Sequence, residues 1–281
     1  MPRLNRFRTA PLGNADAFTP SAAHPVRVRS RSMPADTNLQ PHEHPWAQLA
    51  YCATGTVQVV VSSADDPSSS RRTTETTYII PPSRAVWIAP GAQHAINVLE
   101  AAELRTLYID PVAVPAGWLG CRVLVVSALL RELIAALDLL DPHPLQTSGR
   151  EQCIVSLVLD EITHADTQAL GVPLPDALRG DKRLRSLCEA VLRAPAERAT
   201  LAEWAIDIGA SERTVARLFR DELGMSYQQW RQQAILAHAL PLLARGMPVA
   251  QVAAVSGYAS DSAFSAMFKA AMGQPPSQFR G

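Results

Sequence analysis

The chain of 281 residues has only four cysteines, and they are widely spaced. Cys52, Cys121, Cys153 and Cys188 form no CxxC pair, so the sequence offers neither a disulfide framework nor a zinc knuckle. We expect all four to be reduced and to behave as small, buried hydrophobic residues.

A long uninterrupted apolar segment is also missing. A transmembrane helix needs roughly 20 consecutive apolar residues, and the longest candidate, residues 123–140, is interrupted by Arg131, Glu132 and Asp138. The Arg-containing N-terminal stretch lacks the apolar core of a signal peptide. We therefore expect a cytoplasmic protein without a membrane partner.

An excess of charge of either sign is absent too, because 26 basic residues balance 26 acidic ones. The distribution is nevertheless uneven. Residues 1–31 carry six Arg and one Asp, residues 181–281 carry twelve basic and nine acidic side chains, and the middle is acidic. This C-terminal excess is modest, so any binding to nucleic acid would depend on geometry and dimerisation more than on a large positive field.

Length and a hydrophobic content of 47% predict two domains, since they supply enough apolar side chains for more than one core. Residues 1–35 are rich in Arg, Pro and Ala without periodicity and are expected to form a loose arm. Residues 36–112 contain short apolar runs separated by Gly, Pro, Ser and Asp, which is typical of an all-β sandwich or barrel. The expected strands are residues 48–52, 56–61, 77–80, 85–89, 95–99 and 104–109.

Residues 113–166 have a helical period. Two apolar stripes, at 121–140 and 150–164, are separated by Asp141-Pro142-His143-Pro144. These stripes lie either on the barrel or against the same helices of a second subunit, and we assign the region to homodimerisation. Residues 167–180 contain two glycines and two prolines and are expected to be a linker, while residues 62–74 have the polarity of a hairpin loop.

The C-terminal region, residues 181–281, contains an internal repeat. Residues 201–231 match residues 250–280 after a gapless shift of 49 positions. The shift aligns Ala205 with Ala254, Ala210 with Ala259, Ser211 with Ser260, Phe219 with Phe268, Gly224 with Gly273, Gln229 with Gln278 and Arg231 with Arg280. Each copy predicts a helix, a tight turn and a second helix, so the pair suits two successive grooves of a DNA duplex.

The second helix of the first copy is expected to begin after Ser211, a good N-cap residue. Val215, Leu218, Phe219 and Leu223 form its buried face. The exposed surface is expected to contact DNA through Arg213, Thr214, Arg217 and Arg220. Arginine suits this role because its guanidinium binds guanine edges in bidentate fashion or contacts phosphates.

The second copy has a similar buried face, formed by Phe264, Met267, Phe268 and Met272, but a less basic outer face. That outer face consists of Ser262, Ser265, Ala266 and Lys269. It is suited to phosphates more than to bases, so the first copy is expected to carry most of the sequence specificity.

A connecting helix is expected between the copies, over residues 227–244, with Gly246 at its end. Its length of ~27 Å approaches the ~34 Å of one duplex turn. Pro241 lies inside this helix, where it removes one backbone hydrogen bond. The alternative interpretation of the repeat is a packing module without a nucleic-acid role.

Two segments of the C-terminal repeat resemble a known protein family. GYASDSAFSAMFKAAMGQPPSQFR at 257–280 and ASERTVARLFRDELGMSYQQWRQQ at 210–233 resemble the two helix-turn-helix units of AraC/XylS-type transcription regulators. The resemblance covers about the last hundred residues. It implies binding to double-stranded promoter DNA, with RNA polymerase as a further partner, and it implies base contacts by Arg213 and Arg217 and by Ser262, Ser265 and Ala266.

A histidine cluster is the other informative feature, in His42-Glu43-His44-Pro45-Trp46-Ala47-Gln48. In an extended segment, residues 42, 44, 46 and 48 point to one face. A third histidine, His94, follows Ala89-Pro90-Gly91-Ala92-Gln93 in a later strand-turn-strand segment.

These segments resemble the two motifs of the cupin barrel, HxH(x)3E(x)6G and PxG(x)2H(x)3N, and the cupin-sensor subgroup of AraC-type regulators. Gln48 replaces the motif's glutamate, Ala89 replaces its first proline, and Asn97 lies one residue early. The resemblance implies that His42, His44 and His94 converge on one divalent metal ion.

Neutral imidazoles suit Zn(II), Ni(II), Fe(II) or Cu(II). Alternatively, the histidines are polar groups that line the pocket of a small-molecule effector without metal. In either case Trp46 and Arg84 are expected at the mouth of the pocket.

The sequence therefore predicts a two-domain chain, with an all-β cupin-like barrel and dimerisation helices followed by an all-α DNA-binding domain. The predicted function is sequence-specific transcription regulation, activating or repressing, in which an effector alters how the dimer engages DNA. A metal-dependent cupin enzyme, a dioxygenase or isomerase with a helical appendage, is the alternative, and the missing glutamate at position 48 speaks against it. A structural adaptor is the third possibility and predicts no salt-dependent DNA binding.

Overall fold

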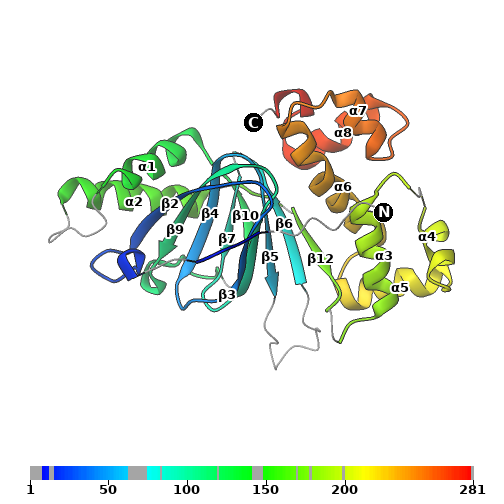
Figure 1. Cartoon of the computed structure of the whole chain (residues 1–281), viewed down its shortest axis with the longest axis horizontal. Coiled ribbons are helices and arrows are strands. Elements are labelled where there is room, and N and C mark those ends of the chain that lie inside the picture. Colours follow the sequence, from blue (N-terminus) through cyan, green and yellow to red (C-terminus); the bar gives the residue numbers. More distant parts are fainter. Residues whose placement is uncertain are drawn as a thin grey trace. The chain divides into compact units, whose positions relative to one another are not determined.

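The computed structural model describes residues 8–12, 16–62, 75–82, 84–118, 120–140, 148–168, 170–176, 179–197 and 200–279. The chain forms two compact units, one of residues 1–61 and 80–168 and the other of residues 62–79 and 169–281 (Figure 1). The first is rich in strands and the second is mainly helical, so the expected two-part fold class is confirmed. Among the described residues, no helix has the length and apolar character needed to span a membrane.

The first unit contains two sheets that enclose a barrel-like interior. Its strands are β1 (Arg8–Ala10), β2 (Val26–Met33), β3 (Thr37–His42), β4 (Ala47–Thr54), β5 (Val57–Ser62), β7 (Arg84–Ile88), β8 (Gln93–Val98), β9 (Ala102–Ile109), β10 (Arg122–Val125) and β11 (Thr167–Gln168). One sheet has the order β1-β3-β8-β5 and the other β11-β10-β7-β4-β9-β2. The five strands that the sequence predicted within this unit are confirmed to within two or three residues as β4, β5, β7, β8 and β9.

The predicted loose arm is wrong, because residues 8–10 form β1, which pairs parallel with β3, and residues 26–33 form β2. All eight pair antiparallel with β9, from Val26 opposite Ile109 to Met33 opposite Ala102. The alternation in VRVRSRSM explains the strand: Val26 and Val28 contact the apolar core, while Arg29 and Arg31 lie on the other face. The partner strand lies about 75 positions further along the sequence, and a local pattern cannot reveal so distant a partner.

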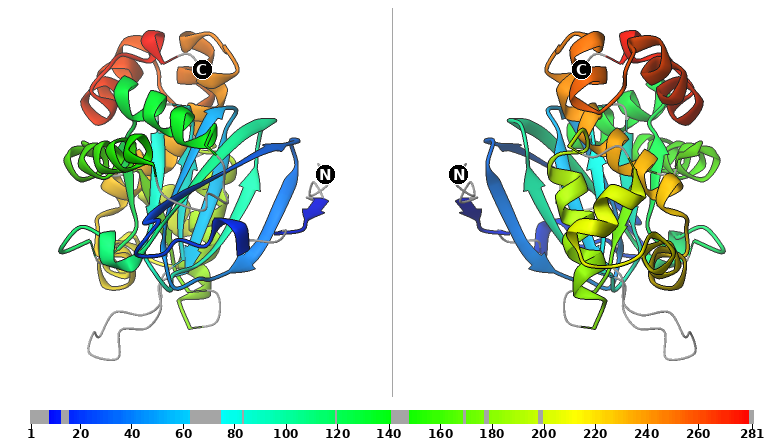
Figure 2. Two further views of the ribbon diagram at one scale, coloured as in Figure 1. Left: turned by 90° about the vertical axis from the view of Figure 1, so that its left-hand side faces the viewer. Right: turned by 90° about the vertical axis from the view of Figure 1, so that its right-hand side faces the viewer.

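Helices α1 (Ala128–Asp138) and α2 (Gly149–His164) cover the second sheet (Figures 1 and 2). Ser127 and Ser148 cap them, each accepting a hydrogen bond from a backbone N–H three residues on. Their apolar stripes pack on one side of the strands, in a core formed by Leu49, Tyr51, Trp87, Leu107, Leu124, Leu130, Ile134, Val158 and Ile162. The sequence left open whether these apolar stripes pack on the barrel or against a second subunit. In the structure the buried stripes pack on the barrel.

Two predicted boundaries in this region are wrong. Residues 122–125, expected in a helix, form β10, which pairs with β7. The expected linker contains two short strands, β11 in the first unit and β12 (Gly171–Leu174) in the second. Residues 63–74 of the expected hairpin loop and the predicted break at 141–144 lie outside the described residues.

In the second unit, β12 pairs antiparallel with β6 (Glu75–Ile80), which contains the remaining predicted strand. Gly171 is required there, because an added Cβ would lie 2.6 Å from the ring of Tyr78. The indole Nε1 of Trp230 donates a hydrogen bond of 2.7 Å to the carbonyl of Pro173. This bond fixes the strand pair to the helical bundle of the same unit.

The helices of the second unit are α3 (Lys182–Arg193), α4 (Leu201–Asp207), α5 (Glu212–Leu223), α6 (Tyr227–Ala244), α7 (Val249–Val255) and α8 (Asp261–Met272). Helix α6 leads from the group of α3, α4 and α5 to the pair of α7 and α8 (Figure 1). The predicted connecting helix is thus confirmed, with Pro241 inside it and Gly246 beyond its end at φ 77°.

The gapless alignment of the two copies is wrong in their first helices. Helices α5 and α8 are 49 positions apart, but α4 and α7 are only 48 apart, as are the left-handed glycines Gly209 and Gly257. The second turn therefore has one additional residue. Buried Ala205 corresponds to buried Ala253, whereas Ala254 is exposed.

The expectation that all four cysteines are buried is wrong for Cys153, which is exposed on α2, and Cys121 is only half-buried. Cys52 and Cys188 are buried as expected. Burial raises the pKa of the Cys52 thiol to about 12, so this side chain is a protonated, apolar component of the core.

Candidate functional site

The first candidate site is a cavity of about 240 Å³ inside the barrel of the first unit. Strand alternation creates it: Gln48, Thr106 and Tyr108 line the cavity, while their neighbours Leu49 and Leu107 belong to the core beneath α1 and α2. The full lining is Leu12, Arg29, Arg31, Leu39, His42, Glu43, His44, Trp46, Gln48, Ile96, Leu104, Thr106 and Tyr108.

An irregularity in β3 brings the histidines to this cavity. Leu39 and His42 are an odd number of residues apart, yet both line it, because the register with β8 shifts between them. The shift places His42 opposite His94. Residues 43–46 form no strand, but His44, Trp46 and Gln48 still line the cavity as the parity argument predicted.

Each histidine ring is oriented by a hydrogen bond from Nδ1 to a backbone carbonyl. His42 donates to Gln40 at 2.9 Å, His44 to Trp46 at 2.8 Å and His94 to Ala92 at 2.9 Å. With the proton on Nδ1, the Nε2 lone pair of a neutral ring is left for a ligand. Histidines that bind metals commonly have such a partner on the second nitrogen.

The environment keeps two of these rings neutral. Burial, assisted by the charges that His42 and His44 would carry, lowers the pKa of His94 to about 3. Burial also lowers the pKa of His42. The Nε2 atom of His94 is buried and has no hydrogen-bond partner among the described residues, which is costly unless a ligand completes the site.

Gln48 occupies the position of the glutamate in the cupin motif. Its side-chain oxygen Oε1 lies 2.9 Å from Nε2 of His44. A neutral His44 that donates from Nδ1 to Trp46 has no proton on Nε2, so this nitrogen and Oε1 face each other with their lone pairs, an arrangement that a bound cation would stabilise. Asn97, the shifted motif asparagine, is bonded instead to Asn38 and Gln58.

The three rings fit a small divalent cation. One ring nitrogen from each of His42, His44 and His94 lies within 4.8 Å of the others. Three neutral nitrogens and an amide oxygen suit borderline metals such as Zn(II), Ni(II), Fe(II) or Cu(II). No carboxylate belongs to this set of the described residues, so a bound cation would leave the cavity positively charged.

Aromatic rings form part of the cavity wall. Trp46 stacks on His44 at 5.0 Å between ring centroids, and Tyr108 meets both rings edge-on. The placement of Trp46 at the cavity is thus as predicted, but that of Arg84 is wrong. Arg84 is buried in β7, does not line the cavity, and donates from Nε to Gln168 at 2.7 Å.

Among the cavity residues that sequence reasoning missed are two arginines, Arg29 and Arg31 of β2. Their strand was interpreted as a loose arm. The period-two alternation of Val and Arg from residue 26 was the available signal.

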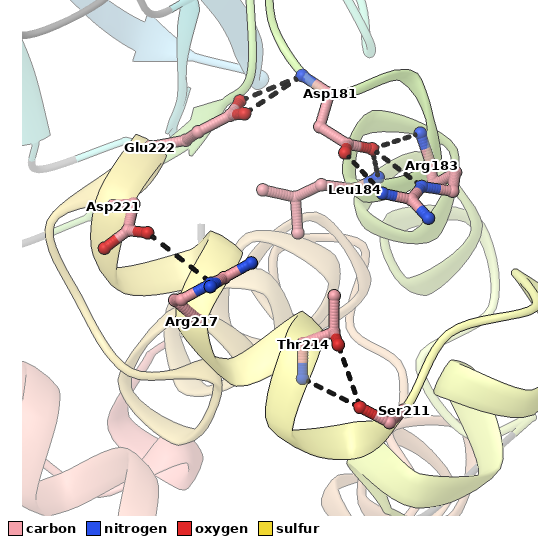
Figure 3. Close-up of polar contacts among 8 residues, drawn as sticks. All are labelled: Asp181, Arg183, Leu184, Ser211, Thr214, Arg217, Asp221 and Glu222. Atoms are coloured by element: carbon pink, nitrogen blue, oxygen red, sulfur yellow. Dashed lines mark hydrogen bonds and ion pairs between the residues drawn. The ribbon is translucent and has the colours of Figure 1, made fainter.

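The second candidate site is the exposed face of α5 (Figure 3). Ser211 caps the helix, its Oγ accepting from the N–H of Thr214 at 3.2 Å, and Gly224 ends it at φ 69°. Val215 and Phe219 are buried, whereas Arg213, Arg217 and Arg220 are all exposed. The arrangement suits a helix that inserts into a major groove.

Existing contacts of these polar side chains are weak or local. Arg217 lies 4.0 Å from the exposed Asp221, and Arg220 donates to its own helix at Ala216. The hydroxyl of Thr214 is 2.8 Å from that of Ser211, so it belongs to the cap (Figure 3). An exposed ion pair of this length contributes little, which leaves Arg217 available for DNA.

Glu222, on α5, anchors α3 in the same unit. Its carboxylate accepts from the backbone N–H of Asp181 at 3.1 Å (Figure 3). Asp181 in turn caps α3, accepting from the N–H groups of Arg183 and Leu184. The orientation of α5 is therefore fixed by polar bonds as well as by apolar packing.

The corresponding face of α8 is less basic. Ser260 caps this helix, accepting from the N–H of Ala263 at 3.2 Å, and Phe264 and Phe268 are buried. Ser262, Ala266 and Lys269 are exposed, and Ser265 is half-buried. By alignment Lys269 corresponds to Arg220, and Ala266 to Arg217.

Comparisons with known proteins agree with this geometry. Residues 204–281 match the family model described as a helix-turn-helix domain, and residues 24–161 match the AraC-like ligand binding domain. The chain is 33% identical over 241 residues to the HTH-type transcriptional regulator NimR of Escherichia coli (strain K12), covering 85% of this chain and 81% of that protein. The chain belongs to the AraC family of transcription regulators.

Two further known proteins match. The arabinose operon regulatory protein of Escherichia coli (strain K12) is 32% identical over 138 residues, which cover 48% of this chain and 47% of that protein. The structure of ToxT from Vibrio cholerae superposes with a TM-score of 0.36 at 13% identity, covering 90% of this chain and 97% of that one.

An AraC-type regulator binds DNA through its helix-turn-helix region and an effector through its other domain. The relatives are regulators, so the alternative of a cupin enzyme is not favoured. Applied to this chain, the family assignment makes the strand-rich unit the ligand-binding part and the helical unit the DNA-binding part.

Proposed function

We propose that this AraC-type regulator acts as a cytoplasmic homodimer whose barrel binds a divalent metal ion, alone or together with a small effector, and thereby changes its affinity for promoter DNA. The supporting observation is the histidine geometry. His42, His44 and His94 each donate Nδ1–H to a carbonyl, and one ring nitrogen of each lies within 4.8 Å of the others. An effector pocket that needed only hydrogen-bonding groups would not require this shared tautomer.

When bound, the metal would supply a fixed positive charge and an open coordination position for an effector atom. The protein's residues define the rest. The carbonyls of Gln40, Trp46 and Ala92 hold the rings, and Gln48 replaces an anionic ligand with a neutral one. A neutral ligand set suits sensing, because it holds the cation less tightly than a set containing a carboxylate.

The test compares two histidine variants of the full chain. His44→Ala removes one ligand, whereas His164→Ala changes an exposed histidine at the end of α2. After dialysis against Zn(II) or Co(II), elemental analysis should find about one metal per wild-type or His164→Ala chain and strongly reduced metal in His44→Ala. Metal should change promoter affinity, measured by fluorescence anisotropy, only in the first two proteins.

Equal metal contents in all three proteins would contradict the proposal, as would a metal response in His44→Ala. Promoter binding without added metal should survive in His44→Ala, because the DNA-binding helices lie in the other unit. RNA polymerase is a further proposed partner, which recruitment assays on the same promoter would reveal.

A further inference from the structure

Two arginines form one wall of the cavity. Arg29 and Arg31 lie on the same face of β2, opposite Thr106 and Leu104 of β9, and all four residues line the cavity. Both arginine side chains are half-buried. The two arginines therefore share the cavity with His42 and His44, whereas His94 is buried behind its lining.

Neither arginine has an acidic partner among the described residues. Arg29 lies over the ring of Phe18, 5.3 Å from its centroid. Arg31 donates to the carbonyls of Pro11 and Leu12 at 2.8 and 3.3 Å. Their neighbour on the same strand, Arg27, is different, because it lies 3.9 Å from the carboxylate of Glu151.

The pair is electrostatically unsatisfied. Burial lowers the pKa of Arg31, and the charge of Arg29 lowers it further. Half-buried like charges are unfavourable unless an anion neutralises them. Glu43 lines the cavity but is exposed, and it forms no ion pair with either arginine.

The other residues of the cavity wall indicate the chemistry of the rest of the ligand. Leu39, Ile96, Leu104, Trp46 and Tyr108 present apolar and aromatic surface. The volume of about 240 Å³ is below the ~300–1,000 Å³ typical of pockets for drug-sized molecules. These features indicate a small organic molecule with one charged end, and the planar fork of arginine matches a planar carboxylate.

We propose that the effector is a small aromatic or aliphatic carboxylate whose charged group lies between Arg29 and Arg31 and whose apolar body contacts Trp46 and Tyr108. This inference rests on the proposed function of the cavity as the effector site. The carboxylate is held by the arginines, while the histidines bind metal or the far end of the molecule.

The experiment uses benzoate as a probe, with benzamide as its uncharged counterpart and phenyl phosphate as an alternative anion. Isothermal titration calorimetry of the full chain should show benzoate binding more tightly than either. Arg29→Gln should weaken benzoate binding by about tenfold or more while leaving benzamide unchanged. Arg29→Lys should recover part of the loss, because it restores the charge without the fork.

The matched control is Arg122→Gln. Arg122 also lies over an aromatic ring, 4.4 Å from that of Trp118, but it does not line the cavity. Its loss should leave benzoate binding unchanged. Thermal denaturation of each variant excludes a general loss of folding as the cause.

Equal affinity for benzoate and benzamide would overturn the proposal, as would unchanged benzoate binding in Arg29→Gln or no binding at millimolar concentration. Tighter binding of phenyl phosphate than of benzoate would also overturn it, because the site would then select a phosphate and not a carboxylate. If Arg29→Gln behaves as wild type while His44→Ala loses metal, only this inference fails. If His44→Ala retains metal, the proposed metal-sensing function fails whatever Arg29 does.

Discussion

Each cavity histidine donates its Nδ1 proton to a carbonyl from its own strand or turn, so the tautomer is fixed before any ligand arrives. This arrangement needs no acidic residue. The replacement of the motif glutamate by Gln48 therefore leaves the rings oriented but removes a negative charge. Since Arg29 and Arg31 also line the cavity, it favours anions whether or not a metal is bound.

Two glycines at equivalent turns offer a prediction at the same scale. Gly209 and Gly257 both have left-handed backbones, with φ of 63° and 80°. A Cβ on Gly257 would lie 3.1 Å from Cα of Ala196, whereas one on Gly209 meets nothing within 4 Å. Gly209→Ala should cost about 1 kcal/mol from backbone strain alone, and Gly257→Ala should cost more, because the chain at Ala196 must shift.

Thermal denaturation followed by circular dichroism checks this order, with the two variants in the same full-length background. A melting temperature for Gly257→Ala equal to or above that of Gly209→Ala would show that the contact with Ala196 is easily relieved.

At the scale of elements, the sequence predicted those strands and helices whose apolar residues are contiguous or periodic. Strands β4 and β9 and helix α6 are examples, because each has a strong local signal. Strands β2, β10 and β12 were missed because pairing with distant partners decides them. The additional residue in the second turn was missed because matching alanines occur by chance in an alanine-rich segment.

The same reasoning explains what was found of the cavity. Histidines at alternate positions are a local pattern, so His42 and His44 were identified, and the spacing of the second motif identified His94. Arg29 and Arg31 depend on β2 pairing with β9, and Arg84 was misplaced because a continuous apolar strand does not reveal which face is inside.

Helices α5 and α8 are expected to have different roles on DNA. Arg217 is exposed on α5, and its only ion pair described is 4.0 Å long, so Arg217→Ala should not disturb folding. It should weaken binding to the cognate operator by about 1–3 kcal/mol with little effect on unrelated DNA. Lys269→Ala on α8 should weaken both alike and reduce the salt slope of log K by about 1.

Fluorescence anisotropy at several salt concentrations, with cognate and unrelated duplexes, measures both quantities. If the two variants change the ratio of specific to non-specific affinity equally, then base reading and phosphate contact are not divided between α5 and α8.

At the scale of the whole molecule, the proposed dimer would have to use surface that the barrel does not already bury. The inner stripes of α1 and α2 pack on the sheet, but Leu129 and Leu157 remain 50% and 47% exposed on these helices. Since net charge is zero and the DNA-binding unit is only modestly basic, two linked DNA-binding units would add the affinity that one lacks.

We therefore expect Leu157→Glu to raise the dimer dissociation constant by about tenfold or more, because it places a charge in an apolar interface. Val112→Glu is the matched control, since Val112 is 78% exposed but lies outside α1 and α2. Sedimentation velocity should find a monomer at low concentration only for Leu157→Glu, and promoter affinity should fall with it. If Leu157→Glu leaves the dimer dissociation constant unchanged, the interface lies elsewhere. If the wild-type protein is a monomer, two linked DNA-binding units cannot be the source of its affinity for DNA.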